Sequence, residues 1–382
     1  MSSEAVTATL SAQKDILATR VLFFCSGFAT AAWAAIIPLV KANTAVSDGT
    51  LGLLLLCLGV GALASMPAAG ALSSRYGCKT LLLASTALFA LLLPLIPLVS
   101  SVWLLAALLI CFGIGIGATD CVMNVQAILV EKQAGKALMS GFHGFYSLGG
   151  IAGAGLMALQ LSLGLNAFIA CVNFTALILL LLAANHQGLL PYANPKEGRS
   201  YAWPKGTVLL IGLICFSLFL AEGTVLDWSG VYLTEYRGLA PSSAALGLFC
   251  FSITMTFGRL TGDWLINQLG ARLVMTVGGL VASAGLVLAI STSSVPLALL
   301  GYALVGLGCA NIVPVMFSAT GKQTVMPQAI AVPAVTTLGY IGVLAGPASV
   351  GALAQYFSLP FALYCIAALI ALATLLSTKV RV

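Results

Sequence analysis

The chain has 382 residues, of which 60% are hydrophobic and 7% are charged, and its mean hydropathy is +1.10. A soluble domain carries about 25% charged residues, so this composition excludes an ordinary soluble protein and indicates one that crosses a membrane many times. The net charge of +6 needs no nucleic-acid partner, because basic residues of membrane proteins collect on the cytoplasmic face, where anionic lipid also lies.

Twelve apolar runs follow one another, each long enough for a helix to cross a hydrocarbon core about 30 Å thick. In the first half we predict transmembrane helices at 19–40, 51–72, 79–99, 102–130, 138–160 and 166–185. In the second half we predict them at 207–229, 243–264, 272–294, 297–320, 328–352 and 359–378. The first run is longer than the apolar part of a signal peptide, so we interpret it as a spanning helix.

A polar segment at 186–206, with three prolines, separates the two sets of runs. We therefore predict an all-α membrane protein made of two six-helix bundles, 19–185 and 207–378, joined by a cytoplasmic linker. Short cytoplasmic tails at 1–18 and 379–382 complete the organisation. Duplicated halves of this kind usually enclose a path for a solute.

The basic residues alternate between the gaps that separate the apolar runs. Fourteen of the sixteen lie in every second gap, namely Lys14, Arg20, Arg75, Lys79, Lys132, Lys136, Lys196, Arg199, Lys205, Arg259, Arg272, Lys322, Lys379 and Arg381. The other gaps hold Lys41 and Arg237. Because Lys and Arg are retained on the cytoplasmic side of short loops, we predict that both termini are cytoplasmic.

Glycines are concentrated in the fourth, fifth, tenth and eleventh runs. They are Gly113, Gly115, Gly117, Gly149, Gly150, Gly153, Gly155, Gly301, Gly306, Gly308, Gly339, Gly342, Gly346 and Gly351. Small residues let helices approach closely in lipid. The pattern fits tight packing alone, or close-packed helices that also rock during a transport cycle.

No pattern of residues indicates an enzyme, a cofactor or a metal site. The chain has two histidines and no HExxH or GxSxG sequence, and its ten cysteines form no CxxC pair. It also has no soluble domain of the kind a membrane sensor would need.

The gap after the second run reads GALSSRYGCK. This segment resembles the signature loop of the major facilitator superfamily, G-x-L-a-D-R-x-G-R-K, and Ser74 stands where the family has an acid. The matching residues are Gly70, Leu72, Arg75, Gly77 and Lys79. The second half repeats the pattern with Gly258, Arg259, Asn267, Gly270 and Arg272. Arg259 and Asp263 lie four residues apart on one helical face and could pair.

The segments 117–127 and 139–150 also resemble a group of rhizopine-related (MosC-like) membrane proteins within that superfamily. The resemblance implies a monomeric, multi-pass transporter of the bacterial inner membrane that works by alternating access. Its implied partners are a small-molecule solute, protons and the lipid bilayer.

Two acids are predicted to couple transport to protons, because an ionisable group inside a bilayer is costly and usually functional. Asp120 precedes Glu131 by eleven residues, which places it about 16 Å from the cytoplasmic edge, with Asn124 on the same face. Glu222 lies about 24 Å along the seventh run. The alternative for Asp120 is a structural acid that bonds a neighbouring helix.

The direction of each acid and the charges at its depth bear on its role. Asp227 should point about 140° away from Glu222 unless Gly223 breaks the helix, so a solvated place at the periplasmic rim is its alternative. We find no Lys or Arg predicted at the depth of Asp120 or Glu222. We therefore expect these acids to take up protons, because desolvation disfavours a charged carboxylate.

The remaining candidates for solute binding are Trp33, Asn124, His143, Tyr146, Asp227, Asn311, Thr336 and Tyr340. Polar groups among them favour a sugar- or polyol-like solute. A drug/proton antiporter is the alternative, with an apolar cavity that Phe24, Phe28, Trp33 and Met123 would line. His143 could equally be a packed histidine, and Trp33 an interfacial anchor.

Overall fold

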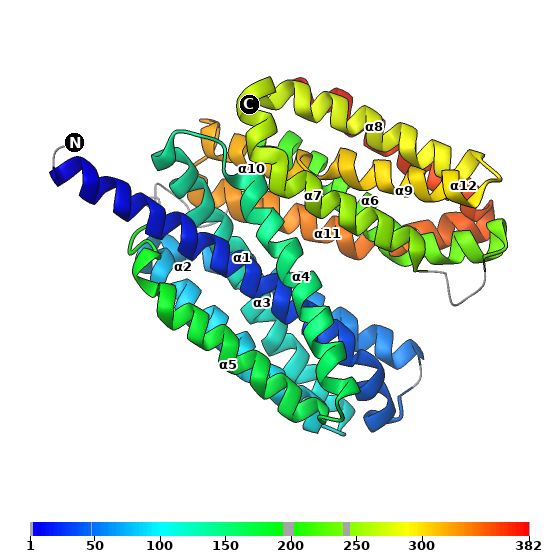
Figure 1. The fold of residues 1–382 in the computed structure, drawn as a ribbon, viewed down its shortest axis with the longest axis horizontal. Coiled ribbons are helices and arrows are strands. Elements are labelled where there is room, and N and C mark those ends of the chain that lie inside the picture. Colours follow the sequence, from blue (N-terminus) through cyan, green and yellow to red (C-terminus); the bar gives the residue numbers. More distant parts are fainter. Residues whose placement is uncertain (1–2, 47, 194–201, 240–244, 382) are drawn as a thin grey trace. The chain divides into compact units, whose positions relative to one another are not determined.

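The computed structural model describes residues 3–46, 48–193, 202–239 and 245–381, and every regular element in these ranges is a helix (Figure 1). The first half contains α1 (Ser3–Thr44), α2 (Asp48–Leu92), η1 (Leu93–Leu98), α3 (Val102–Ala134), α4 (Met139–Ser162), α5 (Ala167–Asn185) and η2 (His186–Gly188). The second half contains α6 (Thr207–Arg237), α7 (Leu246–Leu269), α8 (Ala271–Ser291), α9 (Val295–Cys309), α10 (Ile312–Lys322), α11 (Gln328–Tyr356) and α12 (Leu359–Ser377). The predicted linker residues Lys196, Glu197 and Arg199 lie outside the described ranges.

The helices form two compact units. Unit 1 comprises Met1–Gly135, Phe145–Ala202 and Pro327–Pro333. Unit 2 comprises Lys136–Gly144, Trp203–Met326 and Ala334–Val382. Helices α4 and α11 are each divided between the two units, because the first turns of each helix pack with the opposite half of the chain.

Ten helices of the described ranges are long and apolar enough to cross a membrane. The prediction of twelve differs at two places. The second and third predicted spans belong to one element, α2, which bends at Gly77, and α7 is not among the ten. Helix α7 carries Arg259 and Asp263 within its length, and these charges lower its hydropathy. The count of twelve and the cytoplasmic side of the termini stay predictions.

Aromatic side chains fill the core of unit 1. The rings of Phe28 and Phe174 stack with centroids 4.1 Å apart, and Phe89 meets Phe112 edge-on at 6.3 Å. Trp33 packs against Phe112 at 6.5 Å. These contacts join α1, α2, α3 and α5 around a single apolar cluster.

Glycines bring the helices of each unit into backbone contact. In unit 1, a methyl group on Gly117 would lie 2.5 Å from the Cα of Ala62. In unit 2, a methyl group on Gly301 would lie 2.6 Å from the oxygen of Gly285, and one on Gly342 would lie 2.3 Å from the oxygen of Phe216. The glycine-rich runs therefore pack tightly, as the sequence indicated, and this contact is available only to residues without a side chain.

The two signature segments contain the same backbone turn. Gly77 has φ 82° and ψ 160°, and Gly270 has φ 84° and ψ 145°. Residues other than glycine rarely adopt a positive φ of this size. A methyl group on Gly77 would also lie 2.1 Å from the oxygen of Pro191.

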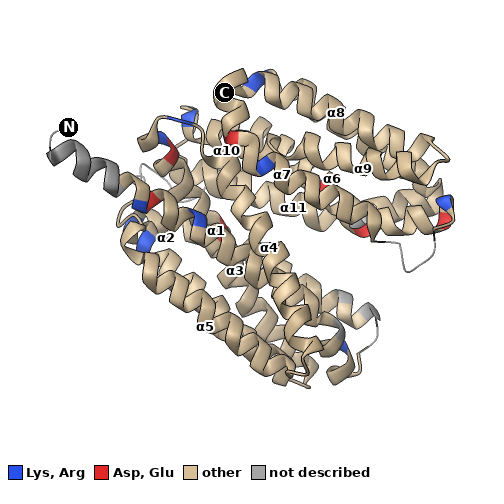
Figure 2. Ribbon diagram, viewed as in Figure 1, with Lys and Arg blue, Asp and Glu red and all other residues tan. Residues whose placement is uncertain are grey.

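The outer faces of the helices are apolar. Large hydrophobic side chains stand exposed along them, among them Trp103, Leu104, Leu180, Phe257 and Leu375. Figure 2 shows most of the ribbon free of charge, with many of the Lys and Arg residues close to helix ends. An apolar exterior of this extent matches hydrocarbon as the surrounding solvent.

Candidate functional site

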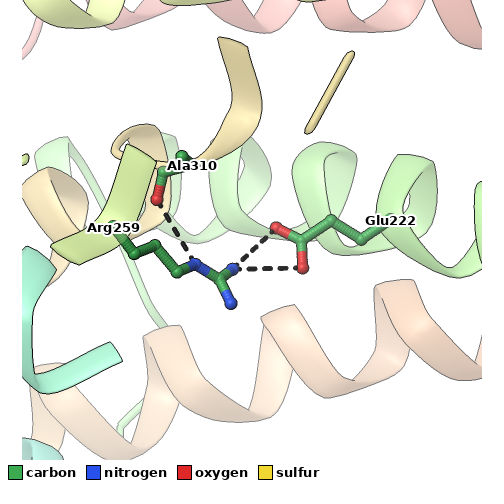
Figure 3. A network of polar contacts seen from close by, with 3 residues as sticks. All are labelled: Glu222, Arg259 and Ala310. Atoms are coloured by element: carbon green, nitrogen blue, oxygen red, sulfur yellow. Dashed lines mark hydrogen bonds and ion pairs between the residues drawn. The ribbon is translucent and has the colours of Figure 1, made fainter. Parts of the chain in front are cut away.

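A buried ion pair in unit 2 joins α6 to α7. Arg259 Nη2 lies 3.2 Å from Glu222 Oε1 and 3.3 Å from Oε2 (Figure 3). The side chain of Arg259 is 8% exposed and that of Glu222 is 17% exposed. Helix α6 is continuous from Thr207 to Arg237, so Gly223 introduces no break.

A break between two helices holds the arginine in place. Helix α9 ends at Cys309 and α10 begins at Ile312, which leaves the carbonyl of Ala310 free to accept a hydrogen bond from Arg259 Nε at 3.4 Å. Asn311 Nδ2 donates to the oxygen of Gly258 at 3.1 Å. Two hydrogen bonds therefore join the break to α7, one through the side chain of Arg259 and one through the backbone oxygen of Gly258.

The ion pair corrects the sequence analysis at two points. Arg259 lies inside α7, eleven residues before Gly270, and not in a cytoplasmic gap; at 1.5 Å per residue this is about 16 Å from the turn. Arg259 therefore does not belong to the alternation of basic residues. The expectation that no cation lies opposite Glu222 is also wrong. In the sequence, Arg259 precedes Gly270 by eleven residues, and this separation could have indicated that Arg259 lies inside the helix.

Asp263 holds the start of another helix. Its Oδ2 accepts a hydrogen bond from the backbone N–H of Gly141 at 2.8 Å, and Asn267 Oδ1 accepts one from Ala137 N at 3.2 Å. Both contacts lie at the N-terminus of α4, where backbone N–H groups are unpaired and a negative charge is favourable. The carboxylate seen on Arg259 is Glu222, whereas the sequence had offered Asp263 as its partner.

Unit 1 contains one acid in the middle of a buried stretch. From Gly115 to Ile128 of α3, every residue except Asp120 is buried, and Asp120 keeps part of its surface accessible. Asn124 is 1% exposed, donates from Nδ2 to the backbone oxygen of Asp120 at 2.9 Å, and leaves Oδ1 without a hydrogen-bond partner. Asp120 is therefore the one residue of this stretch with appreciable accessible surface, and an unpaired amide oxygen lies one turn away.

A polar anchor that sequence reasoning missed lies in the same helix. Gln126 is fully buried, and its Nε2 donates to Thr19 Oγ1 at 3.0 Å while its Oε1 accepts from Leu190 N at 3.1 Å. The backbone N–H of Lys79 donates to the oxygen of Leu190 at 2.8 Å. The start of the linker is thus tied to the first signature segment. A glutamine within an apolar helix was the signal that could have found it.

The signature arginine of unit 1 has an aromatic neighbour. The guanidinium of Arg75 lies over the ring of Tyr76, 5.1 Å from its centroid. Nearby, a methyl group on Gly70 would lie 2.1 Å from the ring of Pro333 in α11. Gly70 therefore serves close helix packing, whereas Gly77 forms the turn.

The aromatic candidates of the first half lie largely inside the core. Trp33 is 5% exposed and Phe28 is 2% exposed, and Met123 is 1% exposed. The side chain of Trp33 packs against Phe112 within unit 1. Its roles as a solute-binding residue or an interfacial anchor stay predictions.

The remaining candidates are dispersed through unit 2 and α4. The ring of His143 lies 5.7 Å from that of Phe317, and Tyr146 follows one turn later, in the part of α4 that belongs to unit 1. Thr336 is buried in α11 and Tyr340 is half-buried there. Asp227 is exposed and lines a cleft of about 490 Å³ that does not include Glu222.

The fold and the ion pair together define a class of protein. Apolar helices form two units, one of which contains a charged pair beside an interrupted helix. Ionisable groups within a membrane protein and carbonyls freed at a helix break both mark solute or ion pathways. This combination indicates a membrane transport protein.

Comparison with known proteins identifies the family. A model of the Major Facilitator Superfamily matches residues 21–249. An uncharacterized MFS-type transporter of Yersinia pestis is 46% identical over 355 residues, which cover 93% of this chain and 92% of that protein. The membrane protein MosC of Rhizobium meliloti is 32% identical over 356 residues, which cover 92% of this chain and 87% of MosC. The chain belongs to the major facilitator superfamily, and its resemblance to MosC-like proteins is confirmed.

A solved structure shows the same fold. The fucose:proton symporter FucP of E. coli superposes with a TM-score of 0.80 at 16% sequence identity, covering 95% of this chain and 97% of the symporter. At this identity the likeness concerns the fold alone. The chain is thus a multi-pass membrane transporter of the major facilitator fold.

Proposed function

We propose that the chain is a secondary active transporter of the bacterial inner membrane that moves a small polar, sugar- or polyol-like solute by alternating access, coupled to protons. The observation that carries the proposal is the accessible carboxylate found in the interior of each unit, Asp120 in unit 1 and Glu222 in unit 2. A carboxylate that meets solvent from alternate sides can take up a proton on one side and release it on the other.

Glu222 gives the coupling a physical form. While ionised it neutralises Arg259 at 3.2 Å. Protonation removes that attraction and frees both side chains to change partners. A proton moved through 100 mV contributes about 2.3 kcal/mol, enough for roughly fiftyfold accumulation of a solute.

Asp120 supplies a hydrogen-bonding site for the solute. Its carboxylate and the unpaired Oδ1 of Asn124 are both acceptors, one turn apart on α3. Acceptors placed in this way suit hydroxyl groups, whose donors would satisfy a buried oxygen that otherwise costs about 1–3 kcal/mol. This supports a polyol-like solute over an apolar drug.

The test uses purified protein in two steps. Thermal unfolding is first measured against sugars, polyols, amino acids and cationic drugs, because a bound solute stabilises the folded state. The compound that stabilises most is then followed into proteoliposomes that carry a proton gradient. We expect Asp120→Asn and Glu222→Gln to abolish or uncouple its accumulation, and Glu235→Gln, which removes an exposed acid of the same helix α6, to leave it intact. Accumulation by both of the first two variants at the unaltered rate would contradict proton coupling through these acids.

A further inference from the structure

We propose that Arg259 is the binding site for a carboxylate on the transported solute, so that the solute is a polyhydroxy acid and not a neutral polyol. This inference rests on the proposed function and names the chemistry of its solute. In the structure as described, Glu222 occupies the place that the carboxylate of the solute takes during transport.

Arg259 is a buried cation. Of the residues whose side chains the structure describes, Arg259 is the one charged residue that is buried. Arginine stays protonated in proteins, and an unpaired buried charge is strongly destabilising. Arg259 therefore requires an anion at every stage of a transport cycle, whichever group provides it.

The two partners of the pair differ in exposure. The side chain of Glu222 is 17% exposed and that of Arg259 is 8% exposed. Glu222 is therefore the partner that we expect to turn away, whereas Arg259 keeps its hydrogen bond to Ala310.

The guanidinium of Arg259 has a backbone contact besides its contact with Glu222. Its Nε donates to the oxygen of Ala310 at the break between α9 and α10, and Asn311 ties the same break to Gly258. Nη2 points at both oxygens of the glutamate, at 3.2 and 3.3 Å (Figure 3). A guanidinium fixed by backbone stays aimed at the same position when one carboxylate replaces another, and such recognition of carboxylates is what arginine suits.

Replacement of Glu222 by the carboxylate of the solute is accompanied by the uptake of one proton. When a carboxylate of the solute binds Arg259, Glu222 leaves and takes a proton from solvent, so that the site again holds one cation and one anion. When the solute leaves, Glu222 loses the proton and returns to Arg259. One proton therefore travels with one carboxylate. A neutral polyol cannot start this exchange, because it offers no anion to replace Glu222.

Few other charges near the pair compete for this proton. The charge of Glu222 acts on Cys215 of α6 and Cys309 of α9, and the charge of Arg259 acts on His143 of α4. Helix α8 and helix α10 carry their charges, Arg272 and Lys322, at their ends, and α11 and α12 contain no Asp, Glu, Lys, Arg or His. Asp263 of α7 lies one turn from Arg259 and accepts a hydrogen bond from Gly141 N, whereas Glu222 of α6 contacts Arg259 directly.

The experiment measures thermal unfolding of the purified full chain against matched probes. Gluconate is compared with sorbitol and galacturonate with galactose, and acetate serves as the smallest carboxylate. We expect the three carboxylates to raise Tm and the neutral compounds to raise it less. The apparent affinity for a carboxylate should fall about tenfold for each unit rise in pH above the range in which Glu222 titrates, since one proton is taken up on binding.

Three variants and one control assign the carboxylate response to the ion pair. Glu222→Gln should bind carboxylates at least as tightly as the native chain and lose the pH dependence, because the internal anion is gone. Arg259→Gln should lose the response to carboxylates, and Arg259→Lys should keep only part of it. Lys205→Gln, which removes an exposed cation of unit 2, is the matched control and should respond like the native chain.

Three results would overturn the inference: no carboxylate, acetate included, raises Tm; the neutral member of a pair stabilises as much as its acid; or Arg259→Gln keeps the response. If Glu222→Gln does not fold, the pH dependence of the native chain decides the question. Proton-driven uptake of a neutral polyol would refute this inference and leave the proposed function standing. Carboxylate binding at Arg259 without proton-driven uptake would refute the proposed function and leave Arg259 standing as the carboxylate-binding site.

Discussion

Neutralising the two partners of the ion pair one at a time should have unequal costs. Glu222→Gln removes the carboxylate that pairs with Arg259, whose side chain is 8% exposed. The guanidinium keeps its hydrogen bond to the oxygen of Ala310. Removing one partner of a buried pair costs about 3–5 kcal/mol, and we expect about 3 kcal/mol here because the pair is partly exposed. Arginine cannot become neutral to reduce this cost.

Arg259→Gln should cost less. The remaining carboxyl of Glu222 is 17% exposed and can take up a proton. The cost is then that of a buried, poorly paired neutral group, about 1–3 kcal/mol. The cost of Arg259→Gln should be smaller in acidic than in alkaline buffer. Glu222 of the unfolded chain is ionised near neutral pH, so folding of the variant requires the uptake of a proton.

The assay is equilibrium unfolding in mixed micelles with increasing SDS, followed by circular dichroism. The double variant Glu222→Gln/Arg259→Gln completes a mutant cycle, and we expect a coupling free energy of about 2 kcal/mol, within the range for residues in direct contact. Glu235→Gln and Lys205→Gln are the matched controls at exposed positions. Two equal single costs together with a coupling energy near zero would refute the reasoning, since they would mean that water already screens both charges.

Three further predictions concern the backbone contacts. Gly77→Ala should destabilise unit 1 by about 1–3 kcal/mol in the same assay, because φ is positive there and the methyl group would meet the oxygen of Pro191; an unchanged free energy of unfolding would be the contrary result. Asp263→Asn should cost about 1 kcal/mol by removing the charge from its hydrogen bond to Gly141 N, and hydrogen exchange should quicken in the first turn of α4 and nowhere else in that helix. Gly301→Val should cost about 1–3 kcal/mol by forcing α8 and α9 apart, and a stable variant would show that these helices can adjust.

Local features of the sequence predicted much of the fold. The apolar runs predicted the membrane helices, because hydropathy sums over neighbouring residues and needs no knowledge of the fold. The glycines at 117, 301 and 342 predicted close helix packing. The repeated signature segments contain Gly77 and Gly270, and the structure shows that their φ values of 82° and 84° are alike. Each of these follows from a property that a residue has by itself.

The candidate site was predicted less well, because it depends on which side chains meet. Asp120, Glu222 and Asn311 were selected for being polar within apolar runs, and each lies in a polar arrangement of its unit. Arg259 was assigned to a loop because the pattern counted every cation as a mark of a helix end. Trp33 was offered to a solute because an indole ring suits stacking, and the structure packs it on Phe112.

The sequence alone thus determined the class of protein, the apolar segments and the family signature of this chain. The tertiary structure decided the partner of each charge. Glu222, Arg259 and Ala310 are separated by dozens of residues along the chain, and they meet because α6 and α7 pack beside the break between α9 and α10. The free energy of a charge in an apolar interior depends on its neighbours in space, and that information is absent from any local pattern.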